Sequence, residues 1–112
     1  MLCGTASAQI RKLGPLSGRA AVAAYGNTWL QIDRRTLTAL RGLTPPAADR
    51  ATTSRLLHLA DLAINTGIAD ATEAAKSGSN ARFLAAARRA GTLINTAHTA
   101  ARAYGFSACA RW

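Results

Sequence analysis

Two adjacent prolines near the middle of the chain separate two long helical patterns. The sequence there reads Leu43-Thr44-Pro45-Pro46. A residue that precedes proline is pushed out of the helical region, so Thr44 and Pro45 are both expected to be extended. Pro46 suits the first turn of a following helix, because its missing N–H would have no helical partner there. We therefore expect a sharp corner, at which the first part of the chain folds back on the second.

Helical periodicity covers most of the remaining sequence. Apolar residues recur every three or four positions, which is the period of a helix with one buried face. Ser17 is the expected N-cap of the second helix, and Ser79 or Asn80 that of the fourth. Besides the proline corner, the breaks are Gly14-Pro15, Ser77-Gly78-Ser79 and Gly105. The sequence thus predicts a short helix over 4–13 and three long ones over 17–43, 47–76 and 80–104.

The second helix has the clearest division into an apolar and a polar side. Tyr25 and Trp29 fall on its apolar stripe and are predicted to be core residues. Asp33 is placed on the polar side, and Gly26 is a weak point at which the helix could kink. The stripe consists of Val22, Tyr25, Trp29, Ile32, Thr36, Leu40 and Leu43, widened by Leu30 and Leu37. In the fourth helix, Gly91 is expected to permit close approach of a neighbour.

These patterns indicate an all-α fold. Alanine, the best helix former, is very common, whereas aromatic residues make up only 5% of the chain. A length of 112 residues allows one domain at most. We predict a single domain over 1–112, an up-down-up bundle of three long helices plus a short N-terminal helix.

The two cysteines, Cys3 and Cys109, lie near opposite ends of the chain. Their spacing matches no metal-binding motif, so they are either two unrelated thiols or one disulfide. A disulfide would close a loop of just over one hundred residues. It would stabilise the fold by roughly 4 kcal/mol in the chain-entropy treatment. We favour the disulfide, and with it an oxidising compartment.

The charge of the chain is strongly positive. Fourteen Lys and Arg residues face five Asp and Glu residues, which gives a net charge of +9. One interpretation is attraction to a polyanion such as nucleic acid, anionic lipid or an acidic protein. The other is a compositional bias, with charges spread over solvated faces. The arginines of the last helix, Arg82, Arg88, Arg89 and Arg102, are candidates for a polyanion-binding face, although no nucleic-acid-binding motif is present.

Catalytic motifs are missing from the sequence, so we expect no catalytic residues, no cofactor and no enzyme activity. One weak alternative is a metal site. If the last two helices form a hairpin about Gly78, His58 and His98 are equidistant from it, and Asp61 lies at nearly the same level. Two imidazoles and a carboxylate are a recognised ligand set. A polar cluster on the flank of the bundle is the favoured interpretation.

Several stretches resemble a known group of proteins. They are a cysteine near the start, Ile32-Asp33-Arg34-Arg35-Thr36-Leu37, Leu40-Arg41-Gly42-Leu43-Thr44-Pro45-Pro46, Arg55-Leu56-Leu57, Phe83 and Ala103-Tyr104-Gly105-Phe106 before Cys109. The chain is similar in these to small uncharacterised helical proteins of actinobacteria, often predicted to be exported or lipid-anchored. The resemblance implies a Cys3–Cys109 disulfide and an extracytoplasmic location. It supplies no catalytic residues.

The function expected from the sequence is a non-enzymatic, extracytoplasmic helical module that binds a partner through a basic surface. The partner would be an acidic protein or a component of the cell envelope. The alternative is a cytoplasmic nucleic-acid-binding protein with free cysteines. No window of about 18 apolar residues occurs, so no transmembrane segment is expected. Residues 1–3 lack the features of a signal peptide, so an exported protein would be present here in a processed or trimmed form.

Overall fold

The computed structural model describes residues 8–12 and 18–105. All regular structure within these ranges is helical, which confirms the all-α prediction for them. Residues 8–11 form one helical turn. The longer elements are α2 (Arg19–Arg41), the 3₁₀ turn η1 (Ala47–Asp49), α3 (Arg50–Asp61), the π-helical segment η2 (Leu62–Ile68), α4 (Ala69–Lys76) and α5 (Asn80–Tyr104).

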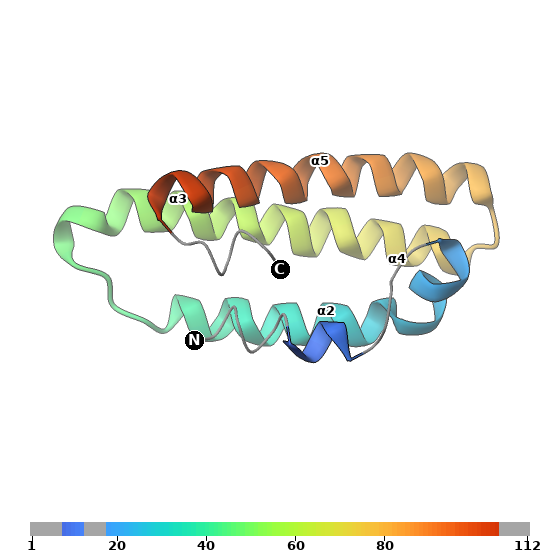
Figure 1. The fold of residues 1–112 in the computed structure, drawn as a ribbon, viewed down its shortest axis with the longest axis horizontal. Helices are drawn as coiled ribbons and strands as arrows, with labels where there is room; N and C mark the ends of the chain where they lie inside the picture. The colour runs from blue at the N-terminus through green and yellow to red at the C-terminus, as the bar shows by residue number, and fades with distance from the viewer. Residues whose placement is uncertain (1–7, 13–17, 106–112) are drawn as a thin grey trace.

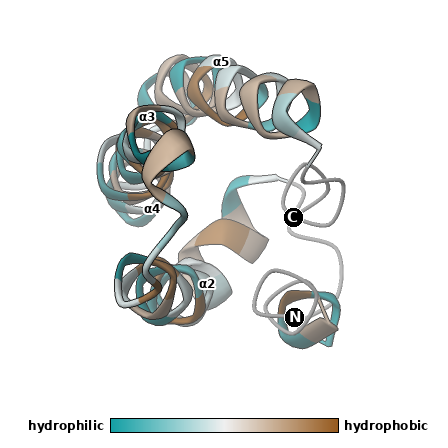
Figure 2. Cartoon of the chain, turned by 90° about the vertical axis from the view of Figure 1, so that its left-hand side faces the viewer, coloured by the Kyte–Doolittle hydropathy of each residue, from teal (hydrophilic) through white to brown (hydrophobic). Residues whose placement is uncertain are grey.

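Three rows of helix lie side by side and make up an elongated molecule with extents of 47 × 25 × 19 Å (Figure 1). The segments α3, η2 and α4 follow one another without a break, and we call them the middle column (Arg50–Lys76). The chain reverses direction at the proline corner and again at the turn before α5. The middle column packs against α2 on one side and against α5 on the other. The end-on view in Figure 2 shows α2 and α5 on different sides of this column.

The breaks between the helices largely follow the sequence signals. Thr44, Pro45 and Pro46 are non-helical, and Pro46 has φ −53° and ψ 147°, as expected for an extended residue. Gly78 adopts φ +81° in the turn before α5, where glycine avoids a steric cost. The Ser79 hydroxyl accepts a hydrogen bond from the Arg82 N–H, so Ser79 is the N-cap of α5. At the start of α2 the N-cap is Gly18, whereas the predicted cap, Ser17, lies outside the described residues.

The apolar face predicted for α2 is partly wrong. Tyr25 is 46% exposed and Leu43 is 61% exposed, while Asp33, expected on the polar side, is only 1% exposed. The physical reason is that the backbone of α2 at Gly26 lies closely against the side chain of Thr72. A Cβ atom on Gly26 would lie 2.6 Å from Thr72 Oγ1 in α4, so only glycine fits there. This contact turns α2 so that its buried line is Val22, Gly26, Leu30, Asp33 and Leu37.

The third predicted helix is continuous but contains an unexpected π-helical segment, η2. Gly67 in this segment lies against α5, since a Cβ atom there would be 3.0 Å from Ala90 Cα. Gly67 and Ala90 are eleven and twelve residues from Gly78, so this contact agrees with the predicted hairpin. The expectation for Gly91 was wrong for the part of the chain that the structure describes, because none of those residues lies within 4 Å of a Cβ atom built on it. The close approach to α5 therefore occurs at Gly67 instead.

The core combines small residues at the helix contacts with a few larger ones that span all three rows. One cluster joins Val22 of α2 to Phe83 and several alanines of α4 and α5. A second joins Leu30 and Leu37 of α2 to Ile64 and Ile68 of η2, with Ile94 of α5 packed against it. Small side chains let the backbones approach, which explains how an alanine-rich sequence fills its core. The opposite side of α5 stays exposed.

Candidate binding surface

A ladder of polar side chains joins α2 to the middle column and the start of α5 along one edge. Its members on α2 are Arg19, Asn27, Arg34 and Arg41, which are spaced by eight, seven and seven residues. Their hydrogen-bond partners are Asn80, Lys76, Asn65 and Asp61, met in descending order along the chain. Side chains at such heptad spacing face a neighbouring helix and fix its register. The sequence contained this spacing, but it was not recognised before the structure.

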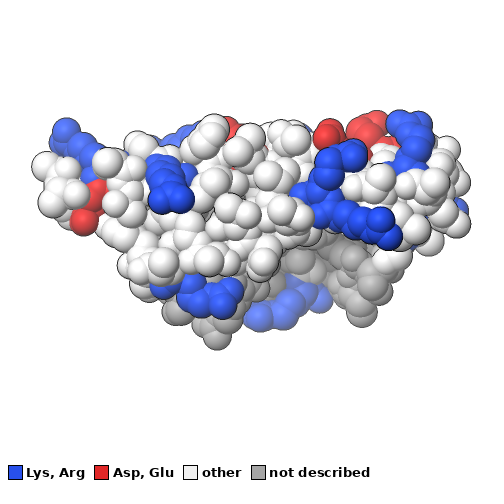
Figure 3. Space-filling view, turned by 90° about the horizontal axis from the view of Figure 1, so that it is seen from above, with Lys and Arg blue, Asp and Glu red and all other residues white. Residues whose placement is uncertain are grey.

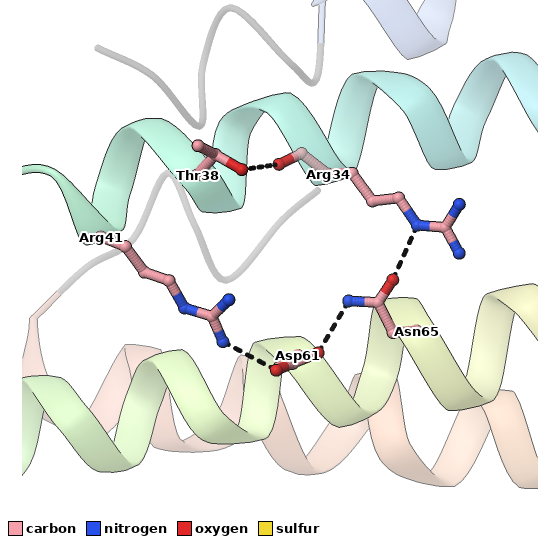
Figure 4. Close-up of polar contacts among 5 residues, drawn as sticks. All are labelled: Arg34, Thr38, Arg41, Asp61 and Asn65. Atoms are coloured by element: carbon pink, nitrogen blue, oxygen red, sulfur yellow. Dashed lines mark hydrogen bonds and ion pairs between the residues drawn. The ribbon is translucent and has the colours of Figure 1, made fainter.

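At the end of this ladder nearest the proline corner, three short hydrogen bonds form a chain (Figure 4). Arg41 Nη2 donates to Asp61 Oδ2, Asn65 Nδ2 donates to Asp61 Oδ1, and Arg34 Nε donates to Asn65 Oδ1, each at 2.7 Å. The hydrogen bond from Asn65 and then that from Arg41 lower the pKa of Asp61. Both carboxylate oxygens of Asp61 are thus engaged, and the cluster stabilises the contact between helices.

The residues considered for a metal site are not brought together. Asp61 faces Arg41 of α2, and His58 is exposed one turn earlier in α3. His98 is half-buried on α5, where burial, and to a smaller extent Arg102, lowers its pKa. Within residues 8–12 and 18–105, no group of three His, Cys, Asp or Glu side chains is arranged to hold a metal ion. The polar-cluster interpretation describes Asp61 better than the metal interpretation does.

Four of the five acidic residues are engaged within the fold. Asp61 pairs with Arg41 at 2.7 Å, and Glu73 lies 3.7 Å from Lys76. A hydrogen bond to Asp49 raises the pKa of the Tyr104 phenol. Asp33 is buried. With five acidic residues against fourteen basic ones, and Asp33 buried, the surface keeps an excess of positive charge.

The four candidate arginines of α5 are all exposed, and they form two rows. Each residue turns a helix by about 100°, so Arg82 and Arg89, seven residues apart, lie on nearly the same side. Arg88 lies about 100° around the helix from Arg89, and Arg102 lies close to the line of Arg88. Figure 3 looks down on this side of the molecule, where most of the surface is uncharged and the blue side chains are unevenly spread, some standing apart and some lying together. The arginines therefore flank a strip instead of forming one cluster.

A shallow hollow of about 620 Å³ lies along the side of α5 that carries Arg88. The described residues that line the hollow also include Gly91, Ile94 and His98, together with the polar residues Thr92 and Asn95. Gly91 forms part of its floor, since no atom of the described residues lies within 4 Å of the position of a Cβ there. Among the described residues, the lining of the hollow is mostly uncharged, with Arg88 as its one arginine and His98 held toward its neutral form by its lowered pKa.

Two remaining predictions concern the compartment. Cys3 and Cys109, the predicted disulfide pair, both lie outside the described residues. Among the described helices, none is long and apolar enough to cross a membrane.

Residues 8–12 and 18–105 thus form an all-α fold whose outer helix, α5, carries exposed arginines. No known protein family matches the chain, and comparisons with curated proteins and with solved structures also find no match. The chemistry of the surface is therefore the basis for assigning a function.

Proposed function

We propose that this protein is a non-enzymatic helical module that binds an acidic partner through its basic surface. The observation that carries the proposal is α5, a 25-residue helix with four exposed arginines and no acidic residue. Guanidinium groups pair with carboxylates and phosphates through two parallel hydrogen bonds, which favours them for such recognition. We further propose the up-down-up bundle with a short N-terminal helix as the architecture of the whole chain.

Binding to polyglutamate, a carboxylate polymer, tests this basic surface directly. We expect binding that weakens with added salt and with replacement of two α5 arginines by glutamine, Arg82→Gln with Arg89→Gln. The matched control is Arg50→Gln with Arg55→Gln, which removes the same charge from exposed positions of α3. Equal weakening by both pairs of changes would show general charge attraction and contradict a surface on α5.

The extracytoplasmic location is proposed from the cysteine pair and from the resemblance to exported actinobacterial proteins. In this proposal the partner is an acidic protein or a component of the cell envelope. Titration of thiols in protein that is denatured without reductant tests the Cys3–Cys109 disulfide. We expect no free thiol in protein made under oxidising conditions, and two free thiols would remove the main support for export.

A second candidate function is nucleic-acid binding. The observation that favours it is the separation of the α5 arginines into two rows, which suits two phosphate backbones better than one acidic patch. Binding to random-sequence duplex DNA, followed as salt is raised, tests this candidate. Affinity that falls steeply with salt indicates several phosphate contacts.

A further inference from the structure

We propose that α5 binds B-form duplex DNA, with its exposed strip in the major groove and its two arginine rows on the two phosphate backbones. This inference rests on the second candidate function and specifies its ligand and geometry. It is carried by the side chains that lie between the rows. Midway between Arg88 and Arg89 around the helix are Ala85 and Thr92, and further along the same strip are Thr96, Thr99 and Ala103.

The shape of this strip suits the groove. All five of these residues are exposed, small and uncharged. An α-helix with its side chains is about 10–12 Å wide, and the major groove of B-DNA is about 12 Å wide. Small side chains along the strip let the helix enter, whereas bulky or acidic ones would keep it out. Threonine hydroxyls and methyl groups can also contact base edges.

The charge of α5 suits two phosphate backbones. A helix in the major groove has a backbone on each side of it, so contacts are needed on both flanks. Arg82 and Arg89 supply one flank, and Arg88 and Arg102 supply the other. Between Ala74 and Trp112 the chain contains no Asp or Glu, so no acidic residue of α5 opposes phosphate.

Other anionic partners fit α5 less well. Binding of single strands relies on aromatic side chains that stack on bases. In α5, Phe83 is buried and Tyr104 is hydrogen-bonded to Asp49. Insertion into a lipid surface requires an apolar face, but Leu84 is the only large hydrophobic side chain of α5 that is markedly exposed, at 54%. The duplex is the partner that uses both arginine rows and the small strip between them.

The experiment measures binding of the full chain to fluorescent duplex DNA of random sequence by anisotropy. Duplex RNA of the same length, single-stranded DNA and polyphosphate are the comparison ligands. Duplex RNA carries the same backbone charge, but its major groove is too narrow for a helix. We expect duplex DNA to bind about tenfold tighter than the other three at about 0.1 M salt. Equal affinity for duplex RNA would overturn docking in the groove.

Variants test the two flanks separately. We expect Arg82→Gln with Arg89→Gln, and Arg88→Gln with Arg102→Gln, each to weaken duplex binding about tenfold and to reduce the salt slope by about 2. The control pair, Arg50→Gln with Arg55→Gln, is expected to weaken it less than about threefold. Equal losses for all three pairs, or a loss for only one flank, would overturn the proposal. Binding to polyglutamate with none to duplex DNA would also overturn it, but would support the first proposed function.

Discussion

At the scale of single residues, two glycines show how tightly the helices pack. Gly26 lies against Thr72 of α4, and Gly67 lies against Ala90 of α5. Gly91, by contrast, has open space where its side chain would be. Glycine in a helix costs about 1 kcal/mol relative to alanine, so a packing role explains the first two glycines but not the third.

Substitution of Gly26 by alanine should therefore destabilise the protein. The added Cβ would be 2.6 Å from Thr72 Oγ1, so α2 and α4 would have to move apart. We expect a loss of about 1–3 kcal/mol in the free energy of unfolding, measured by urea denaturation. The matched control is Gly91→Ala, which should stabilise the protein by about 0.5–1 kcal/mol. A neutral Gly26→Ala would show that the contact is looser than described.

The pKa of Asp61 makes a second prediction at this scale. The hydrogen bonds from Asn65 and Arg41 lower this pKa below 3.8, so they favour the ionised carboxylate in the folded state. These hydrogen bonds stabilise the folded state fully at pH values above the pKa that Asp61 has in the unfolded chain. The stabilisation is lost as the pH falls through the lower pKa that Asp61 has in the folded state. Because the side chain is 36% exposed, the contribution should be only about 0.5 kcal/mol.

Asp61→Asn should therefore reduce stability at pH 7 and flatten its dependence on pH below about 4. The measurement is the urea midpoint as a function of pH. Asp70→Asn, at an exposed position of α4, is the control for removing a carboxylate. If the urea midpoint of both variants fell at low pH as it does in the original protein, Asp61 would not be the group responsible for that fall.

At the scale of helices, the sequence predicted where they begin and end better than which way they face. Prolines, glycines and Ser79 act locally, through the backbone and the first turn, so their effects can be predicted without the rest of the fold. The face that α2 buries depends on its contact with Thr72, more than forty residues further along the chain. Periodicity placed Tyr25 in the core and Asp33 at the surface because it ignores such contacts. The π-helical segment η2 likewise depends on packing against α5.

The candidate binding surface was predictable only in part, because the sequence shows local features but not contacts between distant residues. The four arginines of α5 could be identified from the sequence, because they are polar residues of a clearly amphipathic helix. Their division into two rows follows from helical geometry once the helix is known. For the alternative metal site, equal distance from Gly78 gives the level of His58 and His98 along the hairpin but not their direction around the helix.

The polar ladder between α2 and its neighbours makes a prediction about helix pairing. Asn65 links Arg34 to Asp61, so Asn65→Ala removes two hydrogen bonds at once. We expect a loss of about 1 kcal/mol in the free energy of unfolding. Asn95→Ala, at an exposed position of α5, is the matched control and should change stability by less than about 0.5 kcal/mol. Equal effects of the two substitutions would show that the ladder adds nothing to the pairing of the helices.

At the scale of the whole molecule, we expect like-charge repulsion to outweigh attraction between ions. The net charge is +9, and the described residues contain two ion pairs, Arg41–Asp61 and Lys76–Glu73. Three of the four ladder contacts join a cation to an amide oxygen, so they depend weakly on salt. Added salt should mainly screen the repulsion between arginines.

Raising the NaCl concentration from about 0.05 M to about 0.5 M should therefore stabilise the protein. The expected result is an increase in melting temperature, measured by circular dichroism. Sulfate stabilises many proteins because it is excluded from their surface, an effect separate from charge screening. The comparison is therefore made between NaCl and KCl at equal ionic strength. A fall in melting temperature would mean that the ion pairs contribute more than the repulsion costs.

The lack of acidic residues in α5 also has a consequence for proton uptake. Arginine stays protonated throughout the physiological range, and phosphodiesters stay ionised there. Apart from His98, α5 has no side chain that gains or loses a proton between mildly acidic and mildly alkaline conditions. The charge that this helix presents is therefore nearly constant with pH, and a polyanion bound to it would respond to ionic strength but hardly to acidification.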